Sequence, residues 1–345
     1  MEIVDLNTAD NQNIFDTYLG LTASGYDIAN PNRTSAICNL IGAENWDLRT
    51  LRYFRFARIN DGRINPYWPR VFILIFVSLL TDQVPRGLHS ALIRTHLAAI
   101  GNLSPTEVNA TTAGWAAAFP EQAALLRTSR IYTDARTCYR DAIQDEIREN
   151  GIHFGREVLA AQDRLHALLP SHSLSQQVTT ILNPLQADPL TDVENVRGRI
   201  YVVTSHLRVE SYVHEQIHIW LEPYLSAWKD QIAKNVELLN PLYDRMTYLT
   251  YAWDHSAASW NNVFLETLTR VITILVSDGG DPEQQTQQIE DLVQQGFTYA
   301  RPIAETMLMM GKAQALSGEW LERCFRSCAE TSKHSHKPPA SANSC

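Results

Sequence analysis

The sequence feature that most constrains this chain is the pattern His-Glu-x-x-His within residues 213 to 220. On an α-helix, His214 and His218 are four residues apart and lie on one face, where both imidazoles can bind the same metal ion. Glu215 lies beside them, and its carboxylate can reach a water on that ion without binding the ion itself. The pattern therefore predicts a helix with two zinc ligands and a general base, as in a zinc-dependent hydrolase.

The residues around this pattern favour the same interpretation. The chain has 11 histidines in 345 residues. The HExxH pattern would therefore occur by chance in roughly a few per cent of chains with this composition. Apolar residues recur beside the histidines at helical spacing, at Val213, Ile217, Trp220 and Leu221. Residues 199 to 204 are β-branched and aromatic, which predicts a strand shortly before the helix. We expect Pro223 to end the helix, because the residue before a proline is disfavoured in helical conformation.

The rest of the chain predicts an α+β fold that is predominantly α-helical. Helical patterns cover most of residues 35 to 169, with a turn expected at Asn150-Gly151, while the first 30 residues look rich in turns. A second strand is expected within residues 177 to 185. We therefore expect a zincin-like core with a small sheet before the HExxH helix.

The expected domain organisation has three parts. Residues 1–170 form a helical N-terminal region, and residues 171–330 form a zincin-like metallopeptidase region. Residues 331–345 are polar and are expected to be a disordered tail.

Charge and composition limit the classes of partner. A net charge of −9 argues against nucleic acid as the main partner, because phosphate binding needs a basic surface. The most apolar run, residues 71 to 80, is too short to span a bilayer, so we expect a buried helix there and no membrane insertion. The first residues lack a signal-peptide pattern and the five cysteines lack a disulfide spacing, so we expect a cytoplasmic protein, although export by a signal-independent route stays open.

A catalytic zinc ion needs a third protein ligand, and the sequence offers several candidates. Glu266 is our choice, with Asp254 and His255 as rivals. Glu266 belongs to the polar face of a predicted helix from about residue 256 to 277. The members of that face are Asn262, Glu266, Thr269, Arg270 and Thr273. This face is either solvated, with Glu266 and Arg270 as an ordinary i,i+4 pair, or it lines the metal site with Arg270 holding the ligand.

Several motifs in the second half resemble a bacterial family of uncharacterised metallopeptidase-like proteins. The resemblance covers about residues 175 to 310. It is carried by His214-Glu215-Gln216-Ile217-His218 followed by Leu221, Pro223 and Leu225, then Trp260 and Glu266 through Arg270, then Gly296-Phe297-Thr298-Tyr299 and Glu305. The resemblance implies a gluzincin-like zinc site and favours Glu266 as the third ligand, and it implies no particular substrate.

These residues predict a zinc-dependent peptidase that acts on proteins or peptides, with Zn²⁺ as its cofactor. Glu215 would serve as the general base, and Tyr251, His255 and Tyr299 are the candidates for a second donor to the oxyanion. Two alternatives remain at this point. The chain could be an inactive zinc-binding protein, or a helical interaction scaffold in which the HExxH pattern is accidental.

A second cluster near the C-terminus faintly resembles a structural zinc site. Cys324 and Cys328 precede His334 and His336 at a spacing that could hold a metal ion. The simpler interpretation is that the two cysteines pack on a helix face and that the histidines belong to the polar tail.

Overall fold

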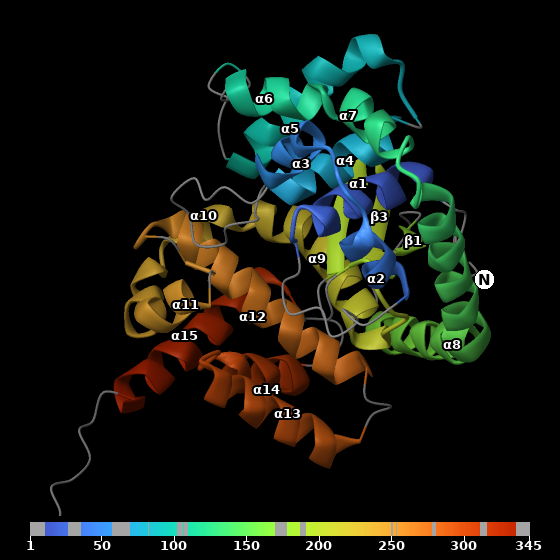
Figure 1. Cartoon of the computed structure of the whole chain (residues 1–345). Helices are drawn as coiled ribbons and strands as arrows, with labels where there is room; N and C mark the ends of the chain where they lie inside the picture. The colour runs from blue at the N-terminus through green and yellow to red at the C-terminus, as the bar shows by residue number, and fades with distance from the viewer. Residues whose placement is uncertain are drawn as a thin grey trace, which may run out of the picture. The chain divides into compact units, whose positions relative to one another are not determined.

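The computed structural model is mostly helical, with one small three-stranded sheet (Figure 1). It describes residues 11–26, 36–56, 70–81, 83–101, 106, 110–169, 178–186, 191–249, 251–252, 254–277, 281–310 and 316–335. The chain divides into two compact units, of which the first holds residues 1–155 and 176–208, and the second holds residues 156–175 and 209–345. The expected α+β, predominantly helical class is confirmed, while the zincin-like core stays a prediction.

The first unit contains the sheet and the N-terminal helices. Its helices are α1 (Gln12–Ala23), α2 (Ala36–Ala43), α3 (Leu48–Arg55), α4 (Arg70–Thr81), the short 3₁₀ helix η3 (Arg86–Leu88), α5 (His89–Gly101), α6 (Ala110–Ala117), α7 (Phe119–Leu126) and the N-terminal part of α8 (Tyr132–Leu168). The apolar run predicted within residues 71 to 80 is α4, and its side chains are largely buried. Among the described residues, no helix is long and apolar enough to cross a membrane.

The sheet of the first unit has the strand order β1-β3-β2. β1 (Val178–Leu182) pairs in parallel with β3 (Arg199–Thr204), and β2 (Thr191–Val196) pairs with β3 as an antiparallel hairpin. Arg197 and Gly198 join the hairpin strands, both with positive φ (56° and 84°), as a two-residue turn of this hand requires. The strand at 199 to 204 is confirmed, and β2 was not expected from the sequence.

β2 was missed because its residues are poor strand formers. Asp192, Glu194 and Asn195 are all depleted in strands. In the structure, however, the carboxyl groups of Asp192 and Glu194 are buried on one face of the sheet, and Tyr18 of α1 donates a hydrogen bond to Asp192 over 2.6 Å. Packing against α4 and pairing with β3 therefore outweigh the intrinsic preference of these residues.

The second unit is helical and holds the HExxH helix. Its elements are the C-terminal part of α8, α9 (Val209–Ala227), α10 (Lys229–Ala233), the 3₁₀ helix η4 (Val236–Leu242), α11 (Tyr243–Tyr248), α12 (Ala257–Ser277), α13 (Pro282–Gln295), α14 (Ala300–Met310) and α15 (Gly318–Ser335). The central helix is α12, which packs against α9, α10, α13 and α14. Its residues Trp260, Phe264 and Leu268 are almost fully buried, so α12 is held rigidly in the core of this unit.

Two predicted boundaries within helices were wrong. No turn occurs at Asn150-Gly151, because α8 continues through both residues, and a glycine in a helix costs only about 1 kcal/mol relative to alanine. Pro223 does not end the motif helix, which continues to Ala227, because burial of Leu221 and Leu225 on either side outweighs the lost backbone hydrogen bond.

The termini differ from expectation as well. The first 30 residues were expected to be turn-rich, but they contain α1, whose Ile14, Phe15 and Leu19 are fully buried. The tail was expected to be disordered from residue 331, but α15 continues to Ser335, as an extension of a helix anchored by buried Trp320 and Phe325. Residues 336–345 lie outside the described residues. The expected division at residue 170 also does not coincide with the two units, since the strands group with the N-terminal helices.

Candidate metal centre

The two histidines of the motif lie on α9, beside the stripe that holds this helix in the core. Val213, Ile217 and Leu221 are buried in the apolar core of the second unit. His214 and His218 therefore lie on the flank of that stripe, with 18% and 20% of their side chains exposed. Their Nε2 atoms are 3.1 Å apart, so both rings direct a nitrogen to one point, as the i,i+4 spacing predicts.

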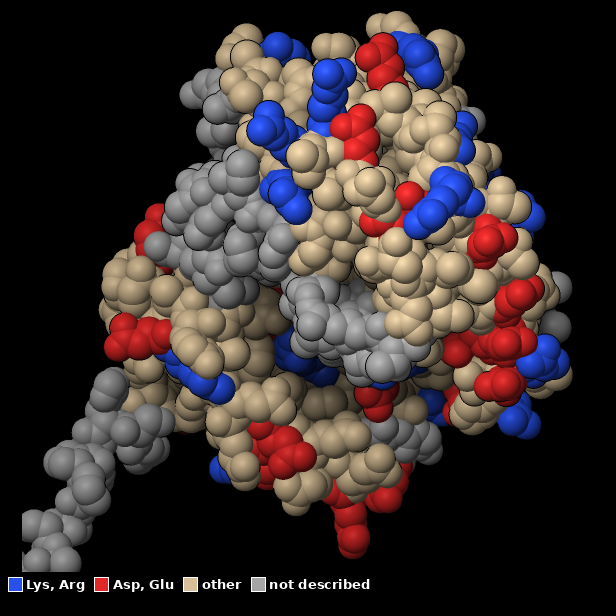
Figure 2. All heavy atoms as spheres, in the orientation of Figure 1, with Lys and Arg blue, Asp and Glu red and all other residues tan. Residues whose placement is uncertain are grey.

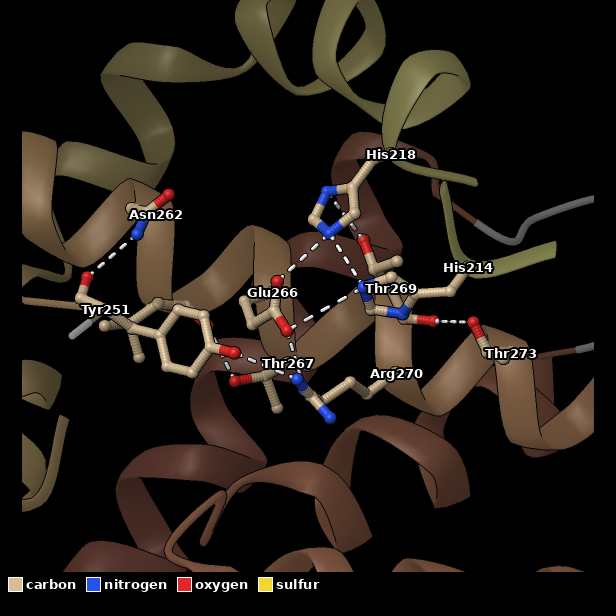
Figure 3. Close-up of polar contacts among 10 residues, drawn as sticks. His214, His218, Tyr251, Asn262, Glu266, Thr267, Thr269, Arg270 and Thr273 are labelled. Atoms are coloured by element: carbon tan, nitrogen blue, oxygen red, sulfur yellow. Dashed lines mark hydrogen bonds and ion pairs between the residues drawn. The ribbon is translucent and has the colours of Figure 1, made fainter. Parts of the chain in front are cut away.

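Glu266 joins these histidines from α12, 48 residues after His218. Its Oε2 lies 3.0 Å from Nε2 of His218, and its Oε1 lies 3.8 Å from Nε2 of His214 (Figure 3). The carboxylate can reach α9 because α12 is anchored by buried apolar residues on the opposite side. These include Trp260, whose indole NH donates to the carbonyl oxygen of Ile232 over 3.1 Å.

The donor atoms of His214, His218 and Glu266 all lie within 4.8 Å of one another, and the three residues could hold a metal ion. Two imidazole nitrogens and one carboxylate oxygen form a ligand set that suits Zn²⁺. The polar face of α12 is not solvated, because Glu266, Thr269 and Thr273 are buried. The alternative of an ordinary solvent-exposed i,i+4 pair is therefore excluded for Glu266.

The protonation states of the three residues differ, although all of them are shielded from solvent. Burial lowers the pKa of His214 to about 3, so this ring is neutral at pH 7 and has a free lone pair. For His218, burial acts in the same direction, but the hydrogen bond and charge of Glu266 outweigh it and raise the pKa. Burial opposes ionisation of Glu266, yet His218, Arg270 and His214 together hold its pKa at about 2. The carboxylate is thus ionised, as a ligand must be.

Arg270 supports the carboxylate from the side opposite to the histidines. Its Nε donates to Oε1 of Glu266 over 2.7 Å, and its Nη2 donates to the hydroxyl oxygen of Tyr251 over 2.9 Å. The guanidinium also lies over the ring of Phe297, with its carbon 4.8 Å from the ring centroid. One planar group therefore fixes the orientation of both Glu266 and Tyr251. This contact agrees with the alternative in which Arg270 holds the carboxylate of Glu266 in place.

Thr269 is a further contact that the sequence analysis did not assign. Its Oγ1 lies 3.4 Å from Nδ1 of His218, the ring nitrogen that faces away from Glu266. A partner on this nitrogen helps to fix the tautomer and the ring plane of a metal-binding histidine. The only sequence signal for this contact was the position of Thr269, which follows Glu266 by three residues and so shares its helix face.

The remaining candidates lie in other surroundings. Asp254 accepts hydrogen bonds from Ser256 and Ser259 at the start of α12. His255 stacks on Tyr243, and its Nδ1 lies 3.1 Å from an amide oxygen. Within the part of the chain that the structure describes, neither Asp254 nor His255 contacts the group formed by the two histidines and Glu266. The structure therefore does not bring Asp254 or His255 together with the two histidines of the motif, whereas it does bring Glu266 there.

Tyr299 is also excluded from the site. Its hydroxyl donates to the carbonyl oxygen of Leu238 over 2.9 Å, and its ring packs edge-on against Trp260 in the core. Tyr251 alone among the oxyanion candidates contacts the residues around Glu266. Burial and the charge of Glu266 raise the pKa of Tyr251, so its hydroxyl keeps its proton at neutral pH.

Cys324 and Cys328 follow the simpler interpretation. Both are fully buried on α15 within the apolar core of the second unit. Burial raises the pKa of the Cys324 thiol well above its ordinary value, which disfavours the thiolate that a zinc ion would bind. The side chain of His334, and all of His336, lie outside the described residues.

Comparisons with known proteins add no relative to this picture. No family model matches the chain, and neither a curated protein nor a solved structure is similar to it at a significant level. The interpretation of the site therefore depends on its own geometry.

Proposed function

We propose that this chain is a zinc-dependent peptidase whose metal ligands are His214, His218 and Glu266. The observation that carries the proposal is the position of Glu266. A carboxylate from a distant helix lies 3.0 Å from one imidazole nitrogen and 3.8 Å from the other, although nothing in the local HExxH pattern requires it. An accidental HExxH pattern on a scaffold helix has no reason to meet a buried, ionised carboxylate at this point.

The donor set favours zinc over harder cations. Mg²⁺ and Ca²⁺ prefer oxygen ligands, whereas two imidazoles with one carboxylate are typical of catalytic zinc sites. A bound Zn²⁺ supplies Lewis acidity, since it lowers the pKa of a water and polarises a carbonyl group. The chain itself prepares the site by keeping His214 neutral and Glu266 ionised at pH 7.

Glu215 is the general base in this proposal. It follows His214 directly on α9, is half-buried, and is close enough for its charge to raise the pKa of His218. Its carboxylate accepts a proton from the attacking water and passes it to the leaving nitrogen of the cleaved bond. A carboxylate suits both steps, because it is ionised at neutral pH and can hold a proton briefly.

Tyr251 is the proposed second donor to the developing oxyanion. Its hydroxyl oxygen accepts a hydrogen bond from Arg270 and its phenolic hydrogen is donated to Glu266, a partner that the hydroxyl would exchange for the oxyanion. Its backbone is fixed as well, because the side-chain amide of Asn262 donates to the Tyr251 carbonyl oxygen over 2.9 Å. A donor held in place before the reaction stabilises a transition state better than a mobile one.

The test is a paired measurement of metal content and peptide hydrolysis. We expect the wild type to bind one zinc ion per chain and to cleave members of a peptide library. Glu215→Gln should keep the metal but lower hydrolysis by at least about 100-fold. His214→Ala should lose both. Glu210→Gln, which changes an exposed glutamate of the same helix, is the matched control and should resemble the wild type.

The outcomes separate the alternatives. A wild type that binds no zinc ends the proposal and favours the interaction scaffold. A wild type that binds zinc but cleaves no peptide or protein identifies an inactive zinc-binding protein.

A further inference from the structure

A pocket of about 320 Å³ lies within the first unit and is not part of the metal centre. It opens between α1, α7, the C-terminal end of α4 and the start of η3, and α1, α4 and α7 pack against one another (Figure 1). Asn13, Arg86 and Arg127 contribute polar groups to its wall, while Pro120, Ala123 and Ala124 contribute apolar ones. Its volume is at the lower end of the range for small-molecule pockets.

The guanidinium of Arg127 is fixed along one edge. Its Nε and Nη2 lie 2.8 Å and 2.7 Å from Oδ2 of Asp16, a side chain with no solvent exposure. Tyr132 donates its hydroxyl to the other carboxylate oxygen of Asp16 over 2.6 Å. Both oxygens of Asp16 are therefore engaged, and the guanidinium is held on that side, where its Nη2 also lies 3.5 Å from Oδ1 of Asn13. A guanidinium held in this way is pre-organised for an anion, because little freedom is lost on binding.

The second cation of the pocket is Arg86. Arg86 is exposed and forms no ion pair with any described residue. Asp16 balances the charge of Arg127, so among the described residues that line the pocket Arg86 supplies the one excess positive charge. The two arginines favour an anionic group with a planar pair of acceptor oxygens, and the single excess charge favours a monoanion.

The apolar residues of α7 that line the pocket determine the rest of the ligand. Pro120, Ala123 and Ala124 offer small apolar surfaces with no polar side-chain atoms. A short aliphatic chain would bury its surface there without leaving a polar group unpaired.

We propose that this pocket binds a small organic monocarboxylate, whose carboxylate contacts Arg86 and Arg127 and whose short apolar chain contacts Pro120, Ala123 and Ala124. The proposal is independent of the metal centre and gives the first unit a binding function of its own. Because the pocket is small and partly open, the dissociation constant should be on the order of 1 mM.

Isothermal titration of the full chain with sodium butyrate, at constant ionic strength with chloride, tests this proposal. We expect saturable binding of butyrate, weaker binding of inorganic phosphate, and no binding of butylamine, which has the same chain but the opposite charge. Arg86→Gln should weaken butyrate binding about tenfold, because it removes one charge-assisted contact. Arg49→Gln removes an exposed arginine of α3 outside the pocket and is the matched control.

A second variant tests whether the weaker binding of Arg86→Gln comes from the pocket itself and not from the change in net charge. Ala124→Phe should fill the pocket from an exposed position of α7 and abolish butyrate binding while the melting temperature stays near that of the wild type. The proposal is overturned if butyrate shows no saturable binding, if phosphate binds more tightly than butyrate, or if neither variant weakens binding relative to Arg49→Gln.

Discussion

Arg270→Gln should weaken zinc binding by about 10- to 100-fold without preventing it, because in the proposed centre Arg270 orients the ligand Glu266 and does not bind the metal itself. This range corresponds to about 1.4 to 2.7 kcal/mol of binding free energy. Two contacts carry the effect, the 2.7 Å bond to Oε1 of Glu266 and the 2.9 Å bond to Tyr251. Only 9% of the Glu266 side chain is exposed, so water cannot readily replace the lost partner.

The sign of this effect distinguishes orientation from simple charge repulsion. Arg270 is cationic and would repel a metal ion, so a purely coulombic role predicts tighter zinc binding in the glutamine variant. Arg270→Lys keeps the charge but cannot bond two partners with one planar group, and it should bind zinc with intermediate affinity.

Competition with a chromophoric chelator measures these affinities directly. Arg301→Gln is the matched control, since it removes an arginine from an exposed ion pair with Glu290 on the same unit, and its zinc affinity should equal that of the wild type. An Arg270→Gln affinity equal to or higher than the wild-type value would refute the orienting role. The melting temperature of each protein without zinc shows whether a lower zinc affinity arises from unfolding of the variant.

Three further predictions concern the stability of the fold and the two buried cysteines. Burial raises the pKa of Asp192 from 3.8 to about 6, so this carboxyl contributes stability that is complete below pH 3.8 and is lost as the pH rises through about 6. Over that window, the wild type should lose about 3 kcal/mol of unfolding free energy relative to Asp192→Asn, measured by urea denaturation, and parallel curves would contradict this. Gly296→Ala should lower stability by about 1 to 2 kcal/mol, because Gly296 has a φ of 112° and an added Cβ would meet the side chain of Arg245; an unchanged melting temperature would exclude this reasoning. Cys324→Ala with Cys328→Ala should leave the zinc content unchanged, since these buried thiols lie in the core; a lower zinc content would revive a second metal site.

Local patterns predicted the motif helix well, because its signals act within one or two turns. The i,i+4 spacing of His214 and His218 fixes their common face wherever the helix lies in the fold. The bounds of α12, Ala257–Ser277, also agreed closely with the helix expected from about residue 256 to 277.

The place of Glu266 beside the two histidines was harder to predict because a polar helix face has the same sequence pattern whether it is solvated or buried. Only the packing of α12 against α9 shows that Glu266 and Thr269 are buried next to His218. The same difficulty explains β2, in which Asp192 and Glu194 are stabilised by neighbours that are distant in sequence.

Charge on the surface gives little additional guidance. Figure 2 shows one face of the molecule, where basic and acidic side chains are interspersed. The expectation that nucleic acid is not the main partner concerns the whole surface and stays a prediction. The same holds for the cytoplasmic location and for the protein or peptide substrate.

X-ray absorption at the zinc edge, on protein loaded with one equivalent of Zn²⁺, tests the central claim most directly. The account predicts a first shell of nitrogen and oxygen donors at about 2.0 to 2.2 Å that includes two imidazoles, and His214→Ala and His218→Ala should each fail to retain the zinc ion. Glu266→Ala should remove one oxygen donor and leave the imidazole signal. A shell that contains sulfur at about 2.3 Å, or one that is unchanged in Glu266→Ala, would contradict the proposed metal centre.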